Sequence, residues 1–170
     1  SNLGLLFYDV TTLYLETTEK DELRESGFSK DGKNSNPQVV LGLLVSRGGY
    51  TLSYSLFNGS QYEGYTMIPI VDDFVQRFNL GKDFVVIADA DTGYGGLLNV
   101  HHTVRAYEKA GVAAIQFEDQ EFPKKCGHTP GKRVVSLEEM VERIKVAVDA
   151  RQDENTIIIA RSDARQIEGV

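Results

Sequence analysis

A change of hydrophobic period near Thr66 constrains the fold of this chain more than any other feature. Before it, apolar residues form short runs rich in β-branched and aromatic side chains, which favour strands. After it, apolar residues at helical spacing alternate with compact apolar runs. Strands separated by helices of this length pair in parallel through right-handed crossovers. We therefore expect an α/β fold with a single mixed sheet: an antiparallel three-stranded meander, then parallel βα units, with helices on the faces.

The meander is predicted from the first third of the chain. Strand character covers residues 3–8, resumes through residues 11–15, and returns over residues 38–46 and 50–57. The Arg47-Gly48-Gly49 stretch between the last two runs supplies paired glycines, which allow the positive φ of a tight hairpin turn. The intervening residues 16–37 lack periodicity, so we expect an exposed excursion there.

The βα part is predicted to contain strands over residues 84–88, 112–117 and 156–160. Thr66 is placed to cap a first helix, and Ser136 opens a capping box before the last one. We expect the apolar stripes of both helices to be core. The stripe of the last helix consists of Leu137, Met140, Val141, Ile144 and Val148.

Composition excludes several classes of protein. The chain has 170 residues, a formal net charge of -7 and one cysteine. Its negative charge disfavours DNA, and a lone cysteine forms no internal disulfide, which favours a cytoplasmic location. No apolar run approaches the ~20 residues of a membrane span, so we expect a soluble protein. The chain is also shorter than the ~250 residues of a complete eight-stranded α/β barrel.

Charged residues gather where the predicted parallel strands end. Asp89 and Asp91 follow one strand, Glu118 follows the next, and Arg161 ends the last. Ligands of such sheets bind beyond the carboxyl ends of the strands, so these side chains are expected to share one edge. Oxygen donors and a glycine-rich turn suit Mg²⁺, a hard cation that keeps several waters.

A second cluster surrounds the single thiol. Lys124, Lys125 and His128 flank Cys126, and positive neighbours lower a thiol pKa by stabilising the thiolate. We expect Cys126 to be suited to proton transfer.

Simpler interpretations remain open for these residues. Asp9 and the Asp89 turn can be ordinary turn structures, and a lone cysteine such as Cys126 is often a small buried hydrophobe. Arg161 and Asp163 can form a structural ion pair. His101 and His102, at a helix start, are expected on the surface.

The stretches ADADTGYGG, FEDQEFPKKCGH and IIIARSDA resemble motifs of the isocitrate lyase and phosphoenolpyruvate mutase superfamily, closest to its 2-methylisocitrate lyases, over residues 84–170. The resemblance implies Mg²⁺-dependent cleavage of a C–C bond in a 2-hydroxy tricarboxylate, which yields succinate and a 2-oxo acid.

The same resemblance implies a role for each matching residue. Asp89 and Asp91 hold the metal through its water shell and Glu118 supports it. Cys126 protonates the departing carbanion, Lys124 and His128 tune that thiol, and Arg161 steadies the substrate. The chain ends at Val170, directly after the arginine-bearing strand, so we expect half of the pocket and little or no turnover.

Upstream, LLFYDVTTLYLE, SKDGK, the NPQ turn and the NGSQYEG segment resemble the catalytic core of IS4-like insertion-sequence transposases, with an RNase H-like fold, over residues 1–90. This resemblance implies Asp9 and Asp89 as two Mg²⁺ carboxylates of a nuclease. The third carboxylate of that family has no counterpart here, so DNA strand transfer is not expected.

The two resemblances overlap at residues 84–90, which predicts one hybrid domain over residues 1–170. We expect a lyase-type Mg²⁺ and cysteine site that acts on a small carboxylate. A transposase-derived nuclease core and a non-catalytic fold chimera are the alternatives. No membrane partner is expected, and homo-oligomerisation, which would restore the missing half of the pocket, stays open.

Overall fold

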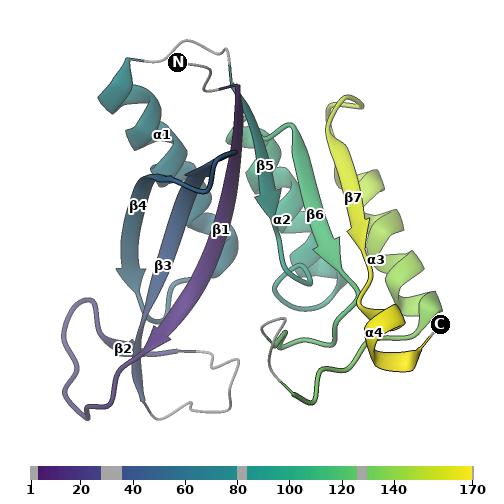
Figure 1. The fold of residues 1–170 in the computed structure, drawn as a ribbon, viewed down its shortest axis with the longest axis horizontal. Helices are drawn as coiled ribbons and strands as arrows, with labels where there is room; N and C mark the ends of the chain where they lie inside the picture. The colour runs from purple at the N-terminus through teal and green to yellow at the C-terminus, as the bar shows by residue number, and fades with distance from the viewer. Residues whose placement is uncertain (1–3, 28–35, 80–83, 126–129, 170) are drawn as a thin grey trace.

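One seven-stranded mixed sheet organises the molecule (Figure 1). The structure is a computed structural model that describes residues 4–27, 36–79, 84–125 and 130–169. The strand order is β2-β3-β1-β5-β6-β7, and β4 pairs with β3. The expected α/β class with a mixed sheet is confirmed.

The antiparallel part contains the meander. Its strands are β1 (Leu5–Tyr14), β2 (Glu25–Ser26), β3 (Pro37–Ser46) and β4 (Thr51–Asn58). The two runs predicted before residue 16 form one continuous strand, β1, which pairs antiparallel with β3. The turn between β3 and β4 closes as expected, with Gly49 at φ 82° and its N–H donating to the Ser46 carbonyl.

The parallel part begins at β5, which lies between the two halves of the sheet. Its strands are β5 (Val85–Asp89), β6 (Ala114–Glu118) and β7 (Ile157–Arg161). Strand β5 pairs in parallel with β1 on one side and with β6 on the other. The N-terminal and C-terminal parts of the chain thus share a sheet through residues 85–89.

Helices join and cover these strands. They are η1 (Glu63–Tyr65), α1 (Met67–Phe78), α2 (Leu97–Lys109), α3 (Leu137–Ala150) and the short α4 (Ala164–Glu168). The three long helices lie on the same face of the sheet, and α2 packs against both α1 and α3 (Figure 1).

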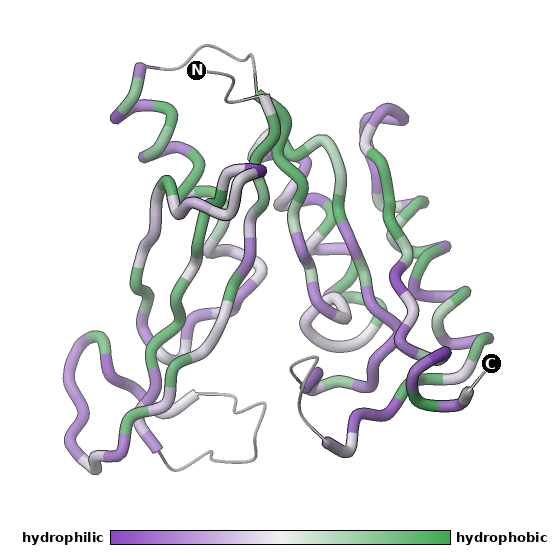
Figure 2. Tube along the Cα trace, in the orientation of Figure 1, coloured by the Kyte–Doolittle hydropathy of each residue, from purple (hydrophilic) through white to green (hydrophobic). Residues whose placement is uncertain are grey.

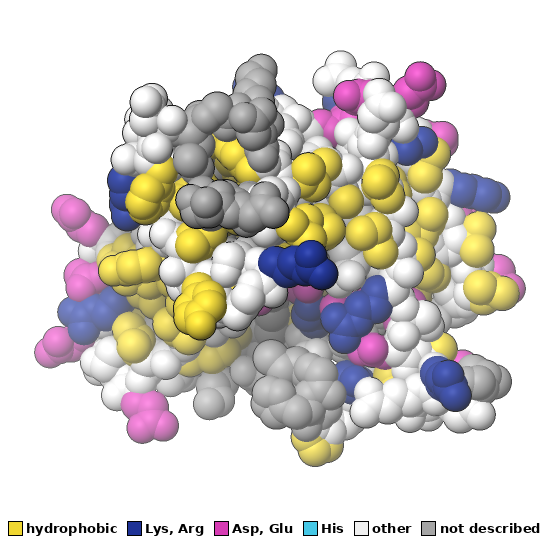
Figure 3. All heavy atoms as spheres, turned by 45° about the horizontal axis from the view of Figure 1, so that its top comes forward, with side chains coloured by type: hydrophobic (Ala, Val, Ile, Leu, Met, Phe, Trp, Pro, Cys, Tyr) yellow, Lys and Arg dark blue, Asp and Glu magenta, His cyan; other side chains and the backbone are white. Residues whose placement is uncertain are grey.

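The prediction of helices on both faces is therefore wrong for the described residues. The other face, which we call the open face, carries alternate side chains of β1, β5, β6 and β7. Phe7, Val85 and Ile157 are exposed large apolar residues there. Figure 3 shows this face tilted, with hydrophobic side chains gathered on its right-hand part. The period-2 pattern of these strands is interrupted by apolar residues on both faces, which is why the sequence indicated two covered faces.

The core lies between the sheet and the three helices. Leu6, Tyr8 and Val86 face the helices and are at most 1% exposed. Phe74 of α1 and Tyr107 of α2 reach the same cluster. Burying a large apolar side chain stabilises the fold by about 1.5–3 kcal/mol, so this cluster supplies much of the stability. Figure 2 shows hydrophobic residues along the central strands and hydrophilic ones in the loops.

The two predicted helix caps have different outcomes. Thr66 makes no side-chain cap on α1; its hydroxyl instead donates to the Glu63 carbonyl and contacts the Tyr8 hydroxyl. Ser136 does cap α3, since its Oγ accepts from the Glu139 N–H at 3.2 Å.

The stripe of α3 was predicted as core, and that prediction is wrong for three of its five residues. Leu137 is 75% exposed, and Val141 and Val148 are also exposed. The helix is rotated so that Arg143, Ala147 and Ala150 are buried. It packs on β7 at the end of the sheet, where one flank of the helix has no described neighbour to cover it.

Candidate active site

The register of the parallel strands gathers the predicted site residues on the open face. Asp89 pairs with Gln116, and Glu118 pairs with Arg161. Paired residues of neighbouring strands point to the same side of a sheet. Tyr8 pairs with Ala88, so continuing the register by one step places Asp9 beside Asp89. The row therefore lies at the carboxyl ends of β5, β6 and β7 and crosses β1 at its middle, so Asp9 lies within a continuous strand and not at a turn.

The turn after β5 has an unusual backbone. Asp91 has φ 52° and Tyr94 has φ 59°, a left-handed conformation that ordinary side chains rarely adopt. The Asp91 N–H donates to Asp89 Oδ1 at 2.8 Å, which fixes the two carboxylates relative to each other. At Gly93, with φ 90°, an added Cβ would lie 2.4 Å from Val100 Cγ2. The glycine is required because the turn packs directly on α2.

Lys124 occupies the centre of the acidic residues. Its ammonium contacts a carboxylate oxygen of Asp91, lies 3.2 Å from Glu118 Oε1 and lies 3.6 Å from Asp89 Oδ2. Burial lowers the pKa of Lys124, but the three carboxylates outweigh it, so the net pKa is raised and the side chain stays charged. One ammonium is thus shared by three carboxylates.

Glu118 is the most deeply buried of these carboxylates, with a side chain only 1% exposed. Its Oε1 also accepts from Arg161 Nη1 at 2.7 Å. Burial raises the pKa of Glu118, the positive charges of Lys124 and Arg161 oppose that rise, and the net direction is upward. The ion pairs hold in place a carboxylate that would otherwise be costly to bury.

Asp9 belongs to the same electrostatic cluster. Burial raises the pKa of its carboxyl, and the negative charges of Asp89 and Asp91 raise it further. Its Oδ1 accepts from the Val10 N–H at 2.9 Å. The structure therefore places Asp9 close enough to the acidic turn for their charges to interact.

A polar network of residues that directly follow β6 and β7 supports this cluster. The Asp119 carboxylate accepts from the Ser162 hydroxyl and, at 2.8 Å, from the Asp163 N–H. Gln120 Nε2 donates to Asp163 Oδ2 at 3.0 Å. Arg161 Nη2 lies 3.7 Å from Asp163 Oδ1, so the ion pair considered from the sequence is present as well.

Arg143 of α3 reaches the same strand end from the helix side. It is 4% exposed, and its Nη1 donates to the Glu118 carbonyl at 2.5 Å and to the Gln120 carbonyl at 3.3 Å. Burial lowers the pKa of its guanidinium, which nevertheless remains in hydrogen-bonding contact with Glu139. Arg143 fixes the backbone that presents Glu118.

The outcome for the predicted residues is mixed. Asp9, Asp89, Asp91, Glu118, Lys124 and Arg161 are brought together. Cys126 and His128 lie outside the described residues, so their predicted roles stay predictions. His101 and His102 are exposed, as expected.

The donor side chains of this cluster bear on the metal prediction. Within the described ranges, no group of three or more His, Cys, Asp or Glu side chains has the arrangement needed to hold a metal ion directly. The carboxylates nevertheless converge on one cation, the Lys124 ammonium. Carboxylate oxygens are donors of the kind that Mg²⁺ prefers, so the Mg²⁺ site held through water stays a prediction.

Sequence reasoning missed two features of this site. Lys124 was predicted beside the thiol, and its contacts with Asp89, Asp91 and Glu118 were not foreseen. Arg143 was overlooked because it lies outside the predicted apolar stripe of this amphipathic helix, and the sequence offered no signal for its burial.

The geometry defines an α/β protein of the class that binds ligands at the carboxyl ends of parallel strands. The chain belongs to the phosphoenolpyruvate phosphomutase family, whose profile matches residues 42–168.

Curated relatives give the same picture. An isocitrate lyase of Haloferax volcanii is 48% identical over 116 residues, which cover 68% of this chain and 33% of that protein. A 2-methylisocitrate lyase of Salmonella typhimurium is 40% identical over 151 residues, which cover 79% of this chain and 51% of that protein. The chain thus spans between about a third and a half of the length of these relatives.

Solved structures agree with the sequence comparison. A 2,3-dimethylmalate lyase matches with a TM-score of 0.55 and 40% identity, over 63% of this chain and 35% of that one. An oxaloacetate acetylhydrolase in complex with 3,3-difluorooxalacetate matches with a TM-score of 0.54 and 39% identity, over 63% of this chain and 36% of that one.

The comparisons do not support the transposase-like part of the prediction. The family match begins at residue 42, so it includes about half of the segment assigned to a transposase. We therefore do not retain the RNase H-like description or the nuclease alternative.

In the part of the chain that the structure describes, no helix combines the length and hydrophobicity of a membrane span.

Proposed function

We propose that the acidic cluster is the cation-binding part of a Mg²⁺-dependent carbon–carbon lyase site for a small 2-hydroxy carboxylate. The observation that carries the proposal is the convergence of Asp89, Asp91 and Glu118 on one positive charge at the carboxyl ends of β5 and β6. The single sheet also supports our proposal that residues 1–170 form one domain.

The relatives narrow the substrate class. Their names describe lyases of isocitrate, 2-methylisocitrate and 2,3-dimethylmalate. All three compounds carry a hydroxyl next to a carboxylate, with a second carboxylate on the neighbouring carbon. We propose a substrate with this arrangement, and 2-methylisocitrate as the first compound to test.

The reaction requires two proton transfers. When the C–C bond breaks, the 2-hydroxyl gives its proton to a carboxylate of the acidic cluster and becomes the carbonyl of a 2-oxo acid, and the bonding electrons pass to the other fragment as a carbanion. That carbanion takes a proton to give succinate. We assign this second proton to the Cys126 thiol, with Lys124 and His128 as the basic neighbours that set its pKa.

The cation and the arginine act on the charges that develop. Bound Mg²⁺ would supply a Lewis acid for the substrate oxygens, held by Asp89, Asp91 and Glu118 through its waters. The side chain of Arg161 is 45% exposed, and its Nη1 lies 2.7 Å from Glu118 Oε1. Its guanidinium therefore lies at the surface of the open face. We propose that it binds a substrate carboxylate there.

The test is a direct assay of the chain. Purified protein is incubated with 2-methylisocitrate and with isocitrate, with Mg²⁺ or with EDTA, and succinate is measured. We expect slow Mg²⁺-dependent formation of succinate, its loss in Cys126→Ser and in Asp91→Asn, and its retention in His101→Gln, which alters an exposed histidine outside the cluster. Absence of succinate together with absence of a Mg²⁺-induced rise in melting temperature would refute the proposal.

A further inference from the structure

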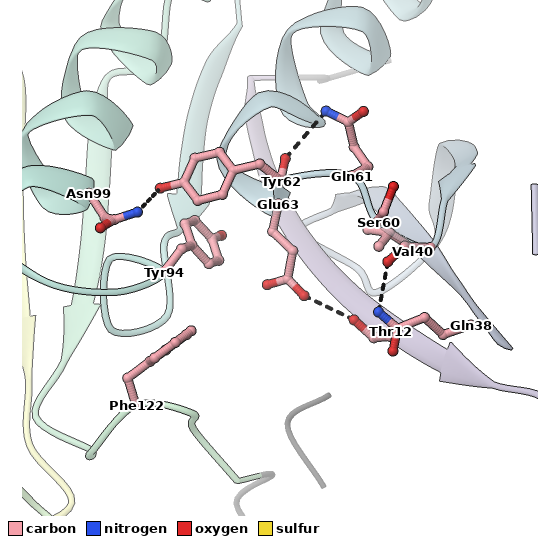
Figure 4. Close-up of a pocket in the computed structure, with 11 residues that line it drawn as sticks. Thr12, Gln38, Val40, Ser60, Gln61, Tyr62, Glu63, Tyr94, Asn99 and Phe122 are labelled. Carbon is pink, nitrogen blue, oxygen red and sulfur yellow. Dashed lines mark hydrogen bonds between the residues drawn. The ribbon is translucent and has the colours of Figure 1, made fainter. Parts of the chain in front are cut away.

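A cavity of about 300 Å³ lies apart from the acidic row, between β1, β3, η1 and the turn before α2 (Figure 4). Its volume is at the lower end of the range of small-molecule sites. Neither the proposed lyase chemistry nor the relatives assign it a ligand. Its walls combine three aromatic rings with one carboxylate.

The aromatic rings come from Tyr62, Tyr94 and Phe122. The rings of Tyr62 and Tyr94 stand almost at right angles, at 79°, with centroids 6.0 Å apart, so they form a corner. Figure 4 shows the Phe122 ring on the same side of the cavity as Tyr94. Three rings arranged around one space present several electron-rich surfaces to a ligand.

Hydrogen bonds hold two of these rings in place. The Tyr62 hydroxyl accepts from Asn99 Nδ2 at 3.3 Å. The Tyr94 hydroxyl donates to the Asp89 carbonyl at 3.2 Å and is 2.9 Å from the Tyr107 hydroxyl. The corner is therefore preorganised, and a ligand would not have to order it.

The carboxylate is that of Glu63. Its Oε1 accepts from the Thr12 hydroxyl at 2.9 Å, and Figure 4 shows it directed into the space between Thr12, Tyr94 and Phe122. Glu63 thus presents a carboxylate to the cavity.

We propose that this cavity binds a small organic ammonium ion. Aromatic faces attract a cation through their quadrupoles, and a carboxylate attracts it through charge, whereas a carboxylate ligand would be repelled by Glu63. The apolar substituents of an alkylammonium ion can pack against Val40 and the ring faces. A hydrated metal ion has no apolar surface for such contacts.

The test uses two probes of nearly equal shape. Choline carries a quaternary ammonium, and 3,3-dimethylbutan-1-ol replaces its nitrogen by carbon and is neutral. Binding of each to the full chain is measured by calorimetry or by ligand-observed NMR. We expect choline to bind about ten-fold more tightly or better, because the ring and carboxylate attractions act only on the charged probe.

Variants locate the binding. Phe122→Leu keeps an apolar side chain without the aromatic face, and Glu63→Gln keeps an acceptor for Thr12 without the charge. Each is expected to weaken choline binding about three- to ten-fold and to leave the neutral probe unchanged. Tyr50→Leu removes an aromatic ring that is 76% exposed on the β3–β4 turn, and is the matched control with no effect expected.

The result that overturns the proposal is equally specific. Equal affinity for the two probes, no binding of choline at millimolar concentration, or choline binding that survives both variants would each exclude an ammonium site here. A melting curve of every variant checks that the fold is intact, so that loss of binding is not confused with unfolding.

Discussion

Lys124 donates to Glu118 Oε1 across 3.2 Å, and this bond joins the loop after β6 to the end of the strand that the loop leaves. Glu118 is buried, whereas the Lys124 side chain is 18% exposed. The ammonium also contacts Asp91 and lies near Asp89. Since three negative groups share this positive one, its removal leaves more uncompensated charge than the loss of a single surface pair.

Lys124→Met is therefore expected to destabilise the protein at pH 7. Breaking a buried ion pair from one side costs about 3–5 kcal/mol, and partial exposure of this lysine places the expected loss near the lower limit, at about 3 kcal/mol. The free energy of unfolding, measured with urea, is the observable.

Lys20→Met is the matched control for this change. Lys20 pairs with Glu25 at 3.5 Å, and both side chains are more than 40% exposed, so the expected loss is below about 1 kcal/mol. Similar small losses in both variants would show that the ammonium of Lys124 is not the centre of the acidic cluster.

The raised pKa values of Asp9 and Glu118 predict a pH dependence of stability. A carboxyl whose pKa is higher in the folded protein binds more protons there than in the unfolded chain, so stability falls as pH rises through the folded pKa. The contribution is fully present below the unfolded pKa, near pH 4, and is lost above the raised folded value.

Asp9→Asn tests this sign. The amide oxygen of the variant still accepts from the Val10 N–H. Loss of the negative charge removes the repulsion from Asp89 and Asp91. We expect a melting temperature higher by about 1–3 °C at pH 7 and no difference below pH 4. A destabilised variant at pH 7 would mean that the Asp9 charge is favourable, contrary to the raised pKa.

Mg²⁺ and Lys124 are expected to compete for the same oxygens. In the wild-type protein Mg²⁺ has to displace an ammonium from Asp91, whereas in Lys124→Met the carboxylates are available. At equal millimolar Mg²⁺, the rise in melting temperature should thus be larger in Lys124→Met than in the wild type. Adding Asp91→Asn to the lysine variant should remove most of that rise. Equal shifts in all three proteins would place Mg²⁺ elsewhere.

The sheet was predictable, apart from the short β2 in the stretch expected to be an exposed excursion, because its other strands have local signatures. Residues 84–88 and 112–117 are compact apolar runs, and the glycines of the 47–49 turn require a hairpin. These signals depend on neighbouring residues only. The same signals predicted where the strands end. Because the carboxyl ends of parallel strands lie at one edge of the sheet, they also predicted that Asp89, Glu118 and Arg161 lie near one another.

The orientation of helices was not predictable in the same way. An apolar stripe shows which face of a helix is able to be buried, but the amount of neighbouring structure decides which residues are covered. The stripe of α3 contains Leu137 and Val141, yet the helix lies on the last strand of the sheet and buries Ala147 and Arg143 instead. The contacts of Lys124 with the acidic residues were missed for a related reason, since they involve the turn after β5 as well as the end of β6.

A last prediction concerns Arg143 and Leu137 of α3, because here the charged side chain is buried and the apolar one is exposed. Arg143→Met keeps most of the side-chain volume but leaves the Glu118 and Gln120 carbonyls without their guanidinium donor. Buried acceptors that lose a charged donor cost about 1–3 kcal/mol, so we expect a loss of about 2 kcal/mol in the free energy of unfolding. Leu137→Ser, at a position 75% exposed, should cost less than about 0.5 kcal/mol. Urea denaturation of both variants checks the ranking, and a larger loss for Leu137→Ser would mean that the apolar flank of α3 is covered in solution.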